Sequence, residues 1–415
     1  MKRLIFIASL AMLAVGCQKT EIQNEVLTPI GFSTEVGKQT RAIADGQTAG
    51  GYLLDQPFAV YAYGWQDGDA NDNPVMNNVE IFVQKRTINS VEEDVWAATG
   101  DVKYYWPNDP STTLNFYAYS PALVNTPTAQ KDHQKLNGTI KHLETAPDDG
   151  SATAGFSLTG YKHSNMYVDF MVATPVLKAT FGHPDGSDTQ LTYAGTAGTV
   201  PLTFNHEMTQ ILFNVTTDKV YPGVKFTITE ISLNNIKNKG DYSHATLTNS
   251  YVDTDAAFTH GGWTNLDVEG SDPYVIFPAD ETNGAVITNT KLTETGKTTI
   301  EAPLVLDYTN IPAGQANSAN KVEVTTTGVT MIPQAITADV QSFTIKYSIE
   351  GTGVAEEDVE KTVQLYPTAT NATVVHWNVN KKITYKVMIG LNEILFEPSV
   401  TAWNPETGNE YTFQQ

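Results

Sequence analysis

Histidine is the side chain best suited to acid–base catalysis and metal binding near neutral pH, and this chain has eight. They are scattered, with neither an HExxH motif nor cysteine partners at zinc-ligand spacing. GxSxG and phosphate-loop motifs are also absent from the sequence. His206, in FNHEMTQ, could act as a base, but its strand-like flanks favour a hydrogen-bonded structural histidine. The sequence therefore predicts no catalytic residue, no metal site and no cofactor, and we expect a protein that is not an enzyme.

The stretch DGDANDN (67–73) has partial calcium-loop spacing, because Asp67, Asp69 and Asn71 match the first three ligands of such a loop. However, Asp72 stands where the loop requires glycine, and Asn78 stands where it requires a bidentate glutamate. A solvated turn is the better interpretation.

Aromatic side chains on the expected strands offer a possible binding surface for sugars, which stack on such rings. Strands are also where aromatic residues normally pack against each other, so core and cross-strand packing is the favoured interpretation. The residues concerned are Tyr61, Tyr63, Trp65, Tyr104, Tyr105, Trp106, Tyr117 and Tyr119.

The only cysteine, Cys17, ends the segment MKRLIFIASLAMLAVGC (1–17). Two basic residues and a short apolar run are typical of a secretory signal peptide, and the run is shorter than the roughly 20 residues of a membrane-spanning helix. The small residue before Cys17 resembles a bacterial lipobox, although Ala14 occupies a position where leucine is usual. We expect Cys17 to be lipidated; an ordinary signal peptide ending near a cysteine is the alternative. No intrachain disulfide can form.

Charge and composition narrow the possible partners. The formal net charge of −21 argues against binding to nucleic acid or anionic lipid, both of which attract basic surfaces. Only 17% of the residues are charged, whereas threonine, asparagine, glycine and tyrosine are abundant, which favours strands and turns. A chain of 415 residues suggests two domains.

The first expected strand lies shortly after Cys17. Ile30, Phe32, Thr34 and Val36 alternate with smaller or polar residues, a period of two that predicts a half-buried strand over 30–36. The polar segment GKQTRAIADGQTAGG (37–51) follows and predicts an exposed loop that contains Arg41. Exposed loops of this kind are preferred sites of proteolysis.

The rest of the chain repeats this alternation, with turn residues every eight to fifteen positions, as in β-sandwiches. LNFYAYSP (114–121) is one example, and no segment has a convincing helical period. The turn-rich TTDKVYPG (216–223) predicts a domain boundary between Asp218 and Gly223. The sequence therefore predicts an all-β protein.

The order of motifs resembles the fimbrillin family of anaerobic Gram-negative bacteria, which supplies subunits of type V pili. After the lipobox-like leader, the motifs are IGFSTEVGKQTRA, KYYWPNDPSTTLNFYAYSP, YVDFMVA, LTFNHEMTQILFNV, VTMIPQ and HWNVNKKITYKVMIGLNEILFEPSVTAW. The resemblance spans nearly the whole chain after the leader.

This resemblance implies two transthyretin-like β-sandwich domains in tandem and export as a lipoprotein. It also implies cleavage by an Arg-specific protease, which here would fall between Arg41 and Ala42. Cleavage would remove the strand with Ile30, Phe32, Thr34 and Val36, and a strand from another subunit's C-terminal region would fill the groove. The expected segments are a signal peptide (1–17), a propeptide (18–41), an N-terminal sandwich (42–220) and a C-terminal sandwich (221–415).

The candidate donor strand lies in ILFEPSVTAW (394–403), where Ile394, Phe396, Val400 and Ala402 would share one face. Pro398 interrupts the middle, which fits two short strands joined by a bend. The alternative is that this segment is simply the last strand of the C-terminal sandwich.

We therefore expect a pilus subunit that supports adhesion, is first lipid-anchored in the outer membrane and then becomes part of a cell-surface fimbrium. Its partners would be other pilus subunits, the lipoprotein export machinery and the Arg-specific protease. One alternative is a non-polymerising surface lipoprotein that binds glycan or a partner adhesin. A secreted hydrolase is disfavoured, because it would need a catalytic constellation assembled across strands.

Overall fold

A computed structural model gives the fold for most of the chain after residue 27. Cys17, Arg41 and Ala42 lie outside the described residues. The structure describes residues 28–36, 56–66, 69–88, 91–98, 102–109, 112–123, 136–142, 155–163, 168–187, 198–244, 261–270, 273–277, 290–292, 298–300, 304–326, 328–351, 357–366, 376–391 and 394–402.

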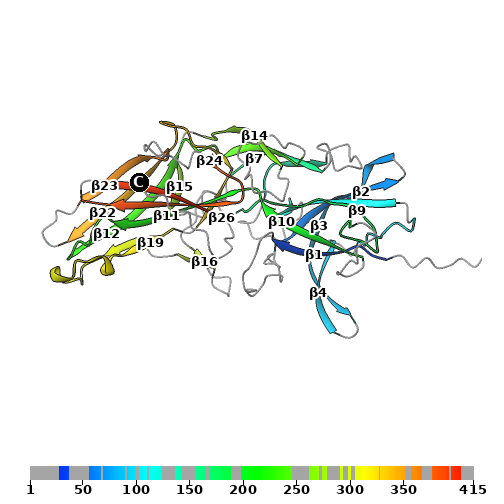
Figure 1. Ribbon diagram of the computed structural model, residues 1–415, viewed down its shortest axis with the longest axis horizontal. Helices are drawn as coiled ribbons and strands as arrows, with labels where there is room; N and C mark the ends of the chain where they lie inside the picture. Colours follow the sequence, from blue (N-terminus) through cyan, green and yellow to red (C-terminus); the bar gives the residue numbers. More distant parts are fainter. Residues whose placement is uncertain are drawn as a thin grey trace, which may run out of the picture.

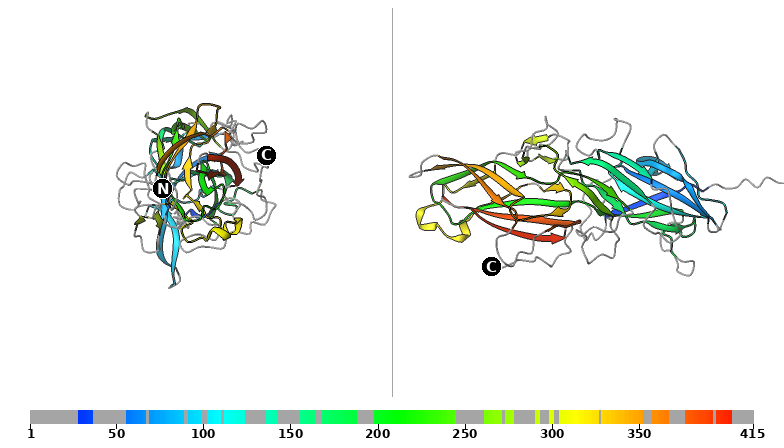
Figure 2. Two further views of the ribbon diagram at one scale, coloured as in Figure 1. Left: turned by 90° about the vertical axis from the view of Figure 1, so that its left-hand side faces the viewer. Right: turned by 90° about the horizontal axis from the view of Figure 1, so that it is seen from above.

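The molecule is elongated, with two β-rich bodies arranged end to end (Figures 1 and 2). The N-terminal body contains an eight-stranded sheet in the order β1-β10-β8-β5-β2-β3-β4, with β9 paired to β5. All its strand pairs are antiparallel except β1–β10, which is parallel. The strands are β1 (Gly31–Val36), β2 (Phe58–Gln66), β3 (Asp69–Ile88), β4 (Val91–Ala98), β5 (Thr112–Ser120), β8 (Met171–Ala173), β9 (Val176–Ala179) and β10 (Thr199–His206).

This large sheet curls around a core of its own. Phe58 on β2 contacts Trp96 on β4 and Phe204 on β10, with ring centroids 5.1 Å and 5.4 Å away. Phe32 on β1 belongs to the same buried cluster. Because β1 and β4 are the two ends of the sheet order, these contacts require the two edges to approach each other.

The opposite face of the large sheet packs on a four-stranded sheet. Tyrosines of β2 and β5 and aromatic residues of the smaller sheet form one buried cluster between them. The strands of the smaller sheet are β6 (Thr139–His142), β7 (Phe156–Lys162), β13 (Lys239–Ser243) and β14 (Gly262–Asp267).

The C-terminal body is a sandwich of two five-stranded sheets around a single core. Phe213 on β11 contacts Phe343 on β22 of the facing sheet, with ring centroids 5.0 Å apart. One sheet contains β11 (Thr209–Thr217), β19 (Glu323–Thr325), β20 (Val329–Met331), β25 (Lys381–Ile389) and β26 (Ile394–Ala402). The other contains β12 (Val224–Asn234), β15 (Tyr274–Phe277), β18 (Leu304–Asp307), β22 (Ser342–Gly351) and β23 (Glu357–Gln364).

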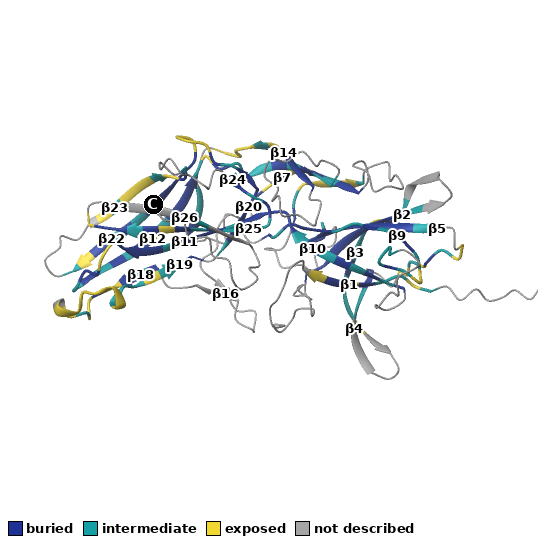
Figure 3. Ribbon diagram, viewed as in Figure 1, coloured by how far each residue is buried: buried dark blue, intermediate teal, exposed yellow. Residues whose placement is uncertain are grey.

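Short elements complete the described fold. Figure 3 shows buried residues running along the central strands of both bodies. Within the described ranges there is no α-helix, and no helix long and apolar enough to cross a bilayer. The short elements are β16 (Thr290–Leu292), β17 (Thr298–Ile300), η4 (Ala313–Gln315), η5 (Ser318–Asn320), β21 (Gln334–Ala335) and β24 (His376–Trp377).

The all-β, sandwich-like architecture expected from the sequence is confirmed. Strand pairing also crosses the expected division at 220/221. Strand β11, which precedes that division, pairs with β25, whereas β13, which follows it, pairs with β7. The division at 220/221 therefore stays a prediction about folding units, and the chain passes between the two bodies more than once.

Candidate functional site

The candidate functional site is the place occupied by β1 at one edge of the large sheet. Strand β1 runs parallel to β10, with Gly31 opposite Thr199 and Val36 opposite Phe204. The Gly31 amide donates a hydrogen bond to the carbonyl of Gly198 (2.9 Å), whereas the Ile30 amide donates to the carbonyl of Tyr104 (2.8 Å). Along a strand, the backbone N–H and C=O groups of successive residues point to opposite sides. The backbone groups of odd-numbered residues of β1 therefore point towards β10, and those of even-numbered residues point away from it.

The side chains of β1 alternate as the sequence predicted. Phe32 and Thr34 are buried, Ile30 is half-buried, and Ser33 and Glu35 are exposed. The backbone of Val36 ends the strand, and its side chain is outside the described part. The expected strand over 30–36 is thus confirmed, with its buried face turned into the core of the large sheet.

Phe32 makes the main apolar contact of this strand. Its ring lies edge-on to Phe58, with centroids 5.9 Å apart, and to Phe116, with centroids 6.1 Å apart. Burial of one phenylalanine side chain contributes about 1.5–3 kcal/mol, and each aromatic edge contact about 0.5–1.5 kcal/mol more. Phe32 therefore accounts for much of the stabilisation that β1 supplies.

Thr34 is a weak point in the same strand. Its side chain is 8% exposed, and its hydroxyl has no hydrogen-bond partner among the described residues. A buried polar group without a partner costs about 1–3 kcal/mol. On the exposed face, by contrast, the Thr203 hydroxyl of β10 donates to a Glu35 carboxylate oxygen at 2.6 Å. On its exposed face, β1 therefore has a side-chain hydrogen bond to β10, whereas on its buried face the Thr34 hydroxyl has no partner among the described residues.

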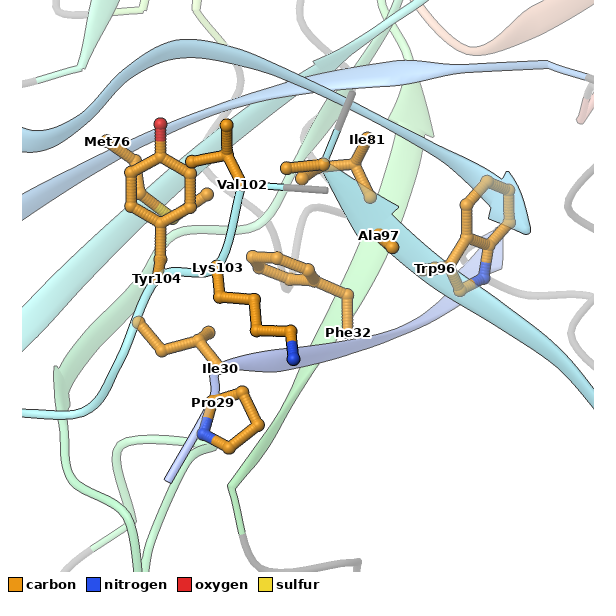
Figure 4. A pocket seen from close by; sticks show the side chains of 11 residues that line it. Pro29, Ile30, Phe32, Met76, Ile81, Trp96, Ala97, Val102, Lys103 and Tyr104 are labelled. Carbon is orange, nitrogen blue, oxygen red and sulfur yellow. The ribbon is translucent and has the colours of Figure 1, made fainter. Parts of the chain in front are cut away.

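A cavity of about 40 Å³ lies beside Phe32, between the two edges of the curled sheet. Figure 4 shows side chains from β1, β3, β4 and the segment before Trp106 converging around it. Within the described residues, no ladder joins β1 to β4. The lining residues are Pro29, Ile30, Phe32, Met76, Ile81, Trp96, Ala97, Ala98, Val102, Lys103 and Tyr104.

The segment that leads into β2, on the C-terminal side of Arg41, has its own hydrogen bonds to the large sheet. The Gln56 side-chain amide donates to the Ser120 hydroxyl (2.8 Å), and the Ala122 amide donates to the carbonyl of Pro57 (3.0 Å). These contacts fix the start of β2 without help from β1. A cut after Arg41 would therefore separate β1 from the body and leave the first bonds of β2 intact.

The candidate donor residues Ile394, Phe396, Val400 and Ala402 all lie on β26, although the structure does not describe their side chains. Strand β26 ends its sheet and pairs antiparallel with β25, with Pro398 opposite Tyr385. The expectation of two short strands bent at Pro398 is wrong, because β26 is continuous. A proline is tolerated there because an edge strand has one side without a ladder partner.

The other sequence candidates do not gather into a second site. His206 is buried and its Nδ1 lies 2.6 Å from an Asp169 carboxylate oxygen, in agreement with the structural interpretation. Residues 69–73 lie in strand β3, so the expected turn is wrong there, while Asp67 lies outside the described residues. Across the described ranges, no group of three or more potential metal-ligating His, Cys, Asp or Glu side chains occurs.

The proposed aromatic platform is mostly core. Tyr61, Tyr63, Tyr117 and Tyr119 are at most 2% exposed and pack between the two sheets of the N-terminal body. Trp106 is also buried, and its indole N–H donates to the carbonyl of Gly198 at 3.1 Å. Of the others, Tyr104 is half-buried, Tyr105 is exposed, and the side chain of Trp65 is not described. Core packing is thus confirmed for most of the set.

Sequence analysis missed His163, a buried histidine that follows β7. Its Nδ1 lies 2.8 Å from the Tyr161 hydroxyl, and its ring stacks on Tyr274 of the C-terminal body, with centroids 5.8 Å apart. Burial lowers the pKa of His163 from 6.5 to about 4. Nothing local in the sequence marks this histidine, because its stacking partner Tyr274 comes from a distant segment.

Comparison with known proteins gives a family match. The sequence model of a family described as fimbrillin-like matches residues 40–305. No protein with a curated description matches the chain. A crystal structure of a fimbrial protein from Bacteroides vulgatus is similar, with 17% identity, a TM-score of 0.49 and coverage of 90% of this chain and 99% of that one.

The tip fimbrial protein Mfa3 from Porphyromonas gingivalis, solved with a C-terminal truncation, is a second similar structure. It shows 10% identity and a TM-score of 0.27, with coverage of 84% of this chain and 94% of that one. Both TM-scores lie below 0.5, so these likenesses do not by themselves establish a shared fold or role.

Proposed function

This chain belongs to the fimbrillin-like family, and on that premise we propose that it is a structural subunit of a cell-surface pilus that supports adhesion. In this proposal the chain is exported as a lipoprotein, loses β1 through cleavage after Arg41 and polymerises by strand exchange. It performs no catalysis. The single observation that carries the proposal is the position of β1, an edge strand whose buried face fills an aromatic core.

The loss of β1 would create a defined acceptor. Without this strand, the edge of β10 presents unpaired amide and carbonyl groups, and the rings of Phe58 and Phe116 lose their contact with Phe32. An open sheet edge beside an apolar slot favours the binding of an extended strand. An acceptor of this kind needs a partner with the same alternation of side chains.

Strand β26 would be the donor. It lies at the end of its sheet, so it can leave without opening a ladder between two other strands. Its departure would expose the edge of β25, which remains paired with β11. In this proposal, the two sandwich-like bodies are transthyretin-like domains, with the acceptor in one and the donor in the other.

The leader supports the order of these events. Lipidation of Cys17 would anchor the precursor in the outer membrane, with β1 inserted and the acceptor closed. Cleavage between Arg41 and Ala42 would then release the tether and β1 together, because both lie on the N-terminal side of the cut. The partners required are the lipoprotein export machinery, an Arg-specific protease and other pilus subunits.

A second candidate is a surface lipoprotein that does not polymerise and binds a partner adhesin. It is favoured by one observation, the full pairing of β26 with β25 within the same chain. A glycan-binding version is disfavoured, because most of the tyrosines that would form the platform are buried.

Digestion of the purified precursor in vitro tests the proposal. The precursor with Cys17→Ser is treated with an Arg-specific protease and resolved by SDS gel electrophoresis without boiling. We expect a ladder of multimers whose members begin at Ala42. A cleaved chain that stays monomeric, with residues 18–41 still bound, would overturn the strand-exchange step. The matched control is Arg41→Ala, which should give no ladder.

A further inference from the structure

Two strands at opposite ends of the chain share one side-chain pattern. IGFSTEV (30–36) contains β1, and ILFEPSV (394–400) forms most of β26. Both have isoleucine, phenylalanine and valine at the first, third and seventh positions. In the N-terminal segment, Phe32 is buried in the core of the large sheet and Ile30 is half-buried against it. The match suggests that the two strands suit the same slot.

We propose that β26 of a second copy takes the place of β1 in the same direction, parallel to β10, with Phe396 at the site of Phe32 and Pro398 at the site of Thr34. This inference rests on the proposed strand exchange and adds its direction, register and partner. Ile394 then occupies the site of Ile30, and Val400 occupies that of Val36.

The site of Phe32 selects for an aromatic side chain. Phe58 and Phe116 lie 5.9 Å and 6.1 Å from the Phe32 ring, both edge-on. In the proposed register, Phe396 brings the same ring to the same place, and Ile394 lies next to it on the cavity side. The incoming strand therefore supplies the same types of buried side chain, a phenylalanine and an isoleucine, at the positions where β1 has them.

The site of Thr34 explains why a donor strand can contain a proline. The Gly31 amide donates to the carbonyl of Gly198, directly before β10, so the amide of residue 34 points away from β10. A proline placed there loses no hydrogen bond to the acceptor strand. It also replaces the Thr34 hydroxyl, which is buried and has no partner among the described residues. Pro398 thus removes the weak point of β1 at no cost to the new ladder.

The outward positions are also compatible. Glu397 takes the exposed place of Ser33, and Ser399 takes that of Glu35, opposite Thr203. Leu395 takes the place of Gly31, where a Cβ would lie 3.2 Å from the Thr199 Oγ1. Rotation of the Thr199 side chain relieves that contact, because its hydroxyl is the near atom.

The opposite direction fits less well. In an antiparallel entry over the same seven positions, Pro398 would fall at the site of Phe32 and Phe396 at that of Thr34. Phe58 and Phe116 would then have no aromatic ring to contact at the site of Phe32. The parallel direction is therefore the one that these two strands favour.

Cysteine cross-linking between two chains tests direction and register together. All chains contain Cys17→Ser, so the engineered thiols are the only ones. Thr203→Cys is placed in the acceptor chain, because the Thr203 and Glu35 side chains meet at 2.6 Å. The donor chain contains Ser399→Cys for the proposed register, Leu395→Cys for the reversed strand or Glu397→Cys for a two-residue shift. The paired full-length precursors are mixed, cleaved with an Arg-specific protease and oxidised.

We expect the Ser399→Cys donor to give at least tenfold more disulfide-linked product than either alternative. Predominant linkage through Leu395→Cys would overturn the direction, and linkage through Glu397→Cys would overturn the register. A multimer ladder without any of these links would also overturn the register. In all three cases strand exchange itself would stand, whereas the absence of both ladder and links would overturn strand exchange and this inference with it. Each single-cysteine chain alone is the control and should give no linked product.

Discussion

The ring of Phe32 on β1 lies edge-on to the ring of Phe58 on β2, with centroids 5.9 Å apart and planes at 83°. In the sequence, Arg41 lies between these two residues. Cleavage after Arg41 would therefore turn a contact within one chain into a contact between two separate pieces. The contact would then last only as long as β1 stays bound without a covalent link.

Replacement of Arg41 tests whether this separation occurs in the cell. We expect Arg41→Ala to block maturation, because an Arg-specific protease needs the arginine side chain. SDS-resistant ladders from the cell surface should disappear, while the amount of lipid-anchored precursor should rise. Lys38→Ala, a change three residues before Arg41, is the control and should leave the ladders intact. Normal ladders from Arg41→Ala would contradict the cleavage step.

Truncation of Phe32 tests how strongly β1 is held in the N-terminal body. We expect Phe32→Ala to lower the free energy of unfolding of the N-terminal body by about 3–5 kcal/mol, since the ring is buried beside an existing cavity. After cleavage, the 18–41 fragment should dissociate faster, as measured by the loss of a fluorescent label on it. Ser33→Ala, on the exposed face, should change neither quantity. Equal effects of both substitutions would argue against the buried role of Phe32.

Thr34 should respond in the opposite sense. Thr34→Val keeps the shape of the side chain and removes a buried hydroxyl that has no partner among the described residues. We expect the precursor to gain about 1 kcal/mol in urea unfolding and the cleaved fragment to leave more slowly. Thr203→Val, which removes a hydroxyl bonded to Glu35, should give no gain. A destabilised Thr34→Val precursor would show that the hydroxyl is satisfied.

Removal of the residues after Asn392 tests the donor strand. The truncated chain should keep a folded N-terminal body, because β26 pairs only with β25 among the described strands. It should accept a donor from an intact chain and fail to donate in return. Mixing truncated and intact subunits would then shorten the ladder in proportion to the truncated fraction. Undiminished ladders from the truncated chain alone would place the donor elsewhere.

The buried His163, which stacks on Tyr274 of the C-terminal body, should make the stability of the folded chain depend on pH. Burial lowers its pKa from 6.5 to about 4, so between these values the unfolded chain binds a proton that the folded chain excludes. Stability is therefore complete above pH 6.5 and falls by about 3 kcal/mol as the pH drops to 4. His163→Gln should flatten this part of the profile in urea unfolding. A profile of unchanged slope would assign the pH dependence to other groups.

Local features of the fold were predictable from the sequence, and long-range ones were not. The alternation in IGFSTEV predicted that Phe32 and Thr34 face the core, because period two is a property of one strand. Its partner β10 comes far later in the chain, and parallel pairing over such a distance leaves no local signal. The turn TTDKVYPG links β11 and β12, whose buried residues belong to one core cluster, and turn residues of this kind mark a reversal of the chain without showing whether a domain ends there.

The candidate site shows the same limit. The two strands and the polar segment with Arg41 were identified from residue types, and their roles were taken from the family resemblance. The missing partner of the Thr34 hydroxyl depends on the placement of neighbouring strands, so sequence could not show it. The shared pattern of 30–36 and 394–400 was readable in the sequence. Only the register of β1 on β10 shows that the amide at the site of Thr34 points away from β10, so that Pro398 can take that site.

The N-terminal sequence of the protein recovered from surface filaments tests the central claim most directly. Cell-surface multimers are sheared from the bacteria, separated without boiling and sequenced from the multimer bands. The account predicts a free N-terminus at Ala42, with residues 18–41 absent from the multimers. A blocked N-terminus at a lipid-bearing Cys17, with β1 still present in the same bands, would contradict it.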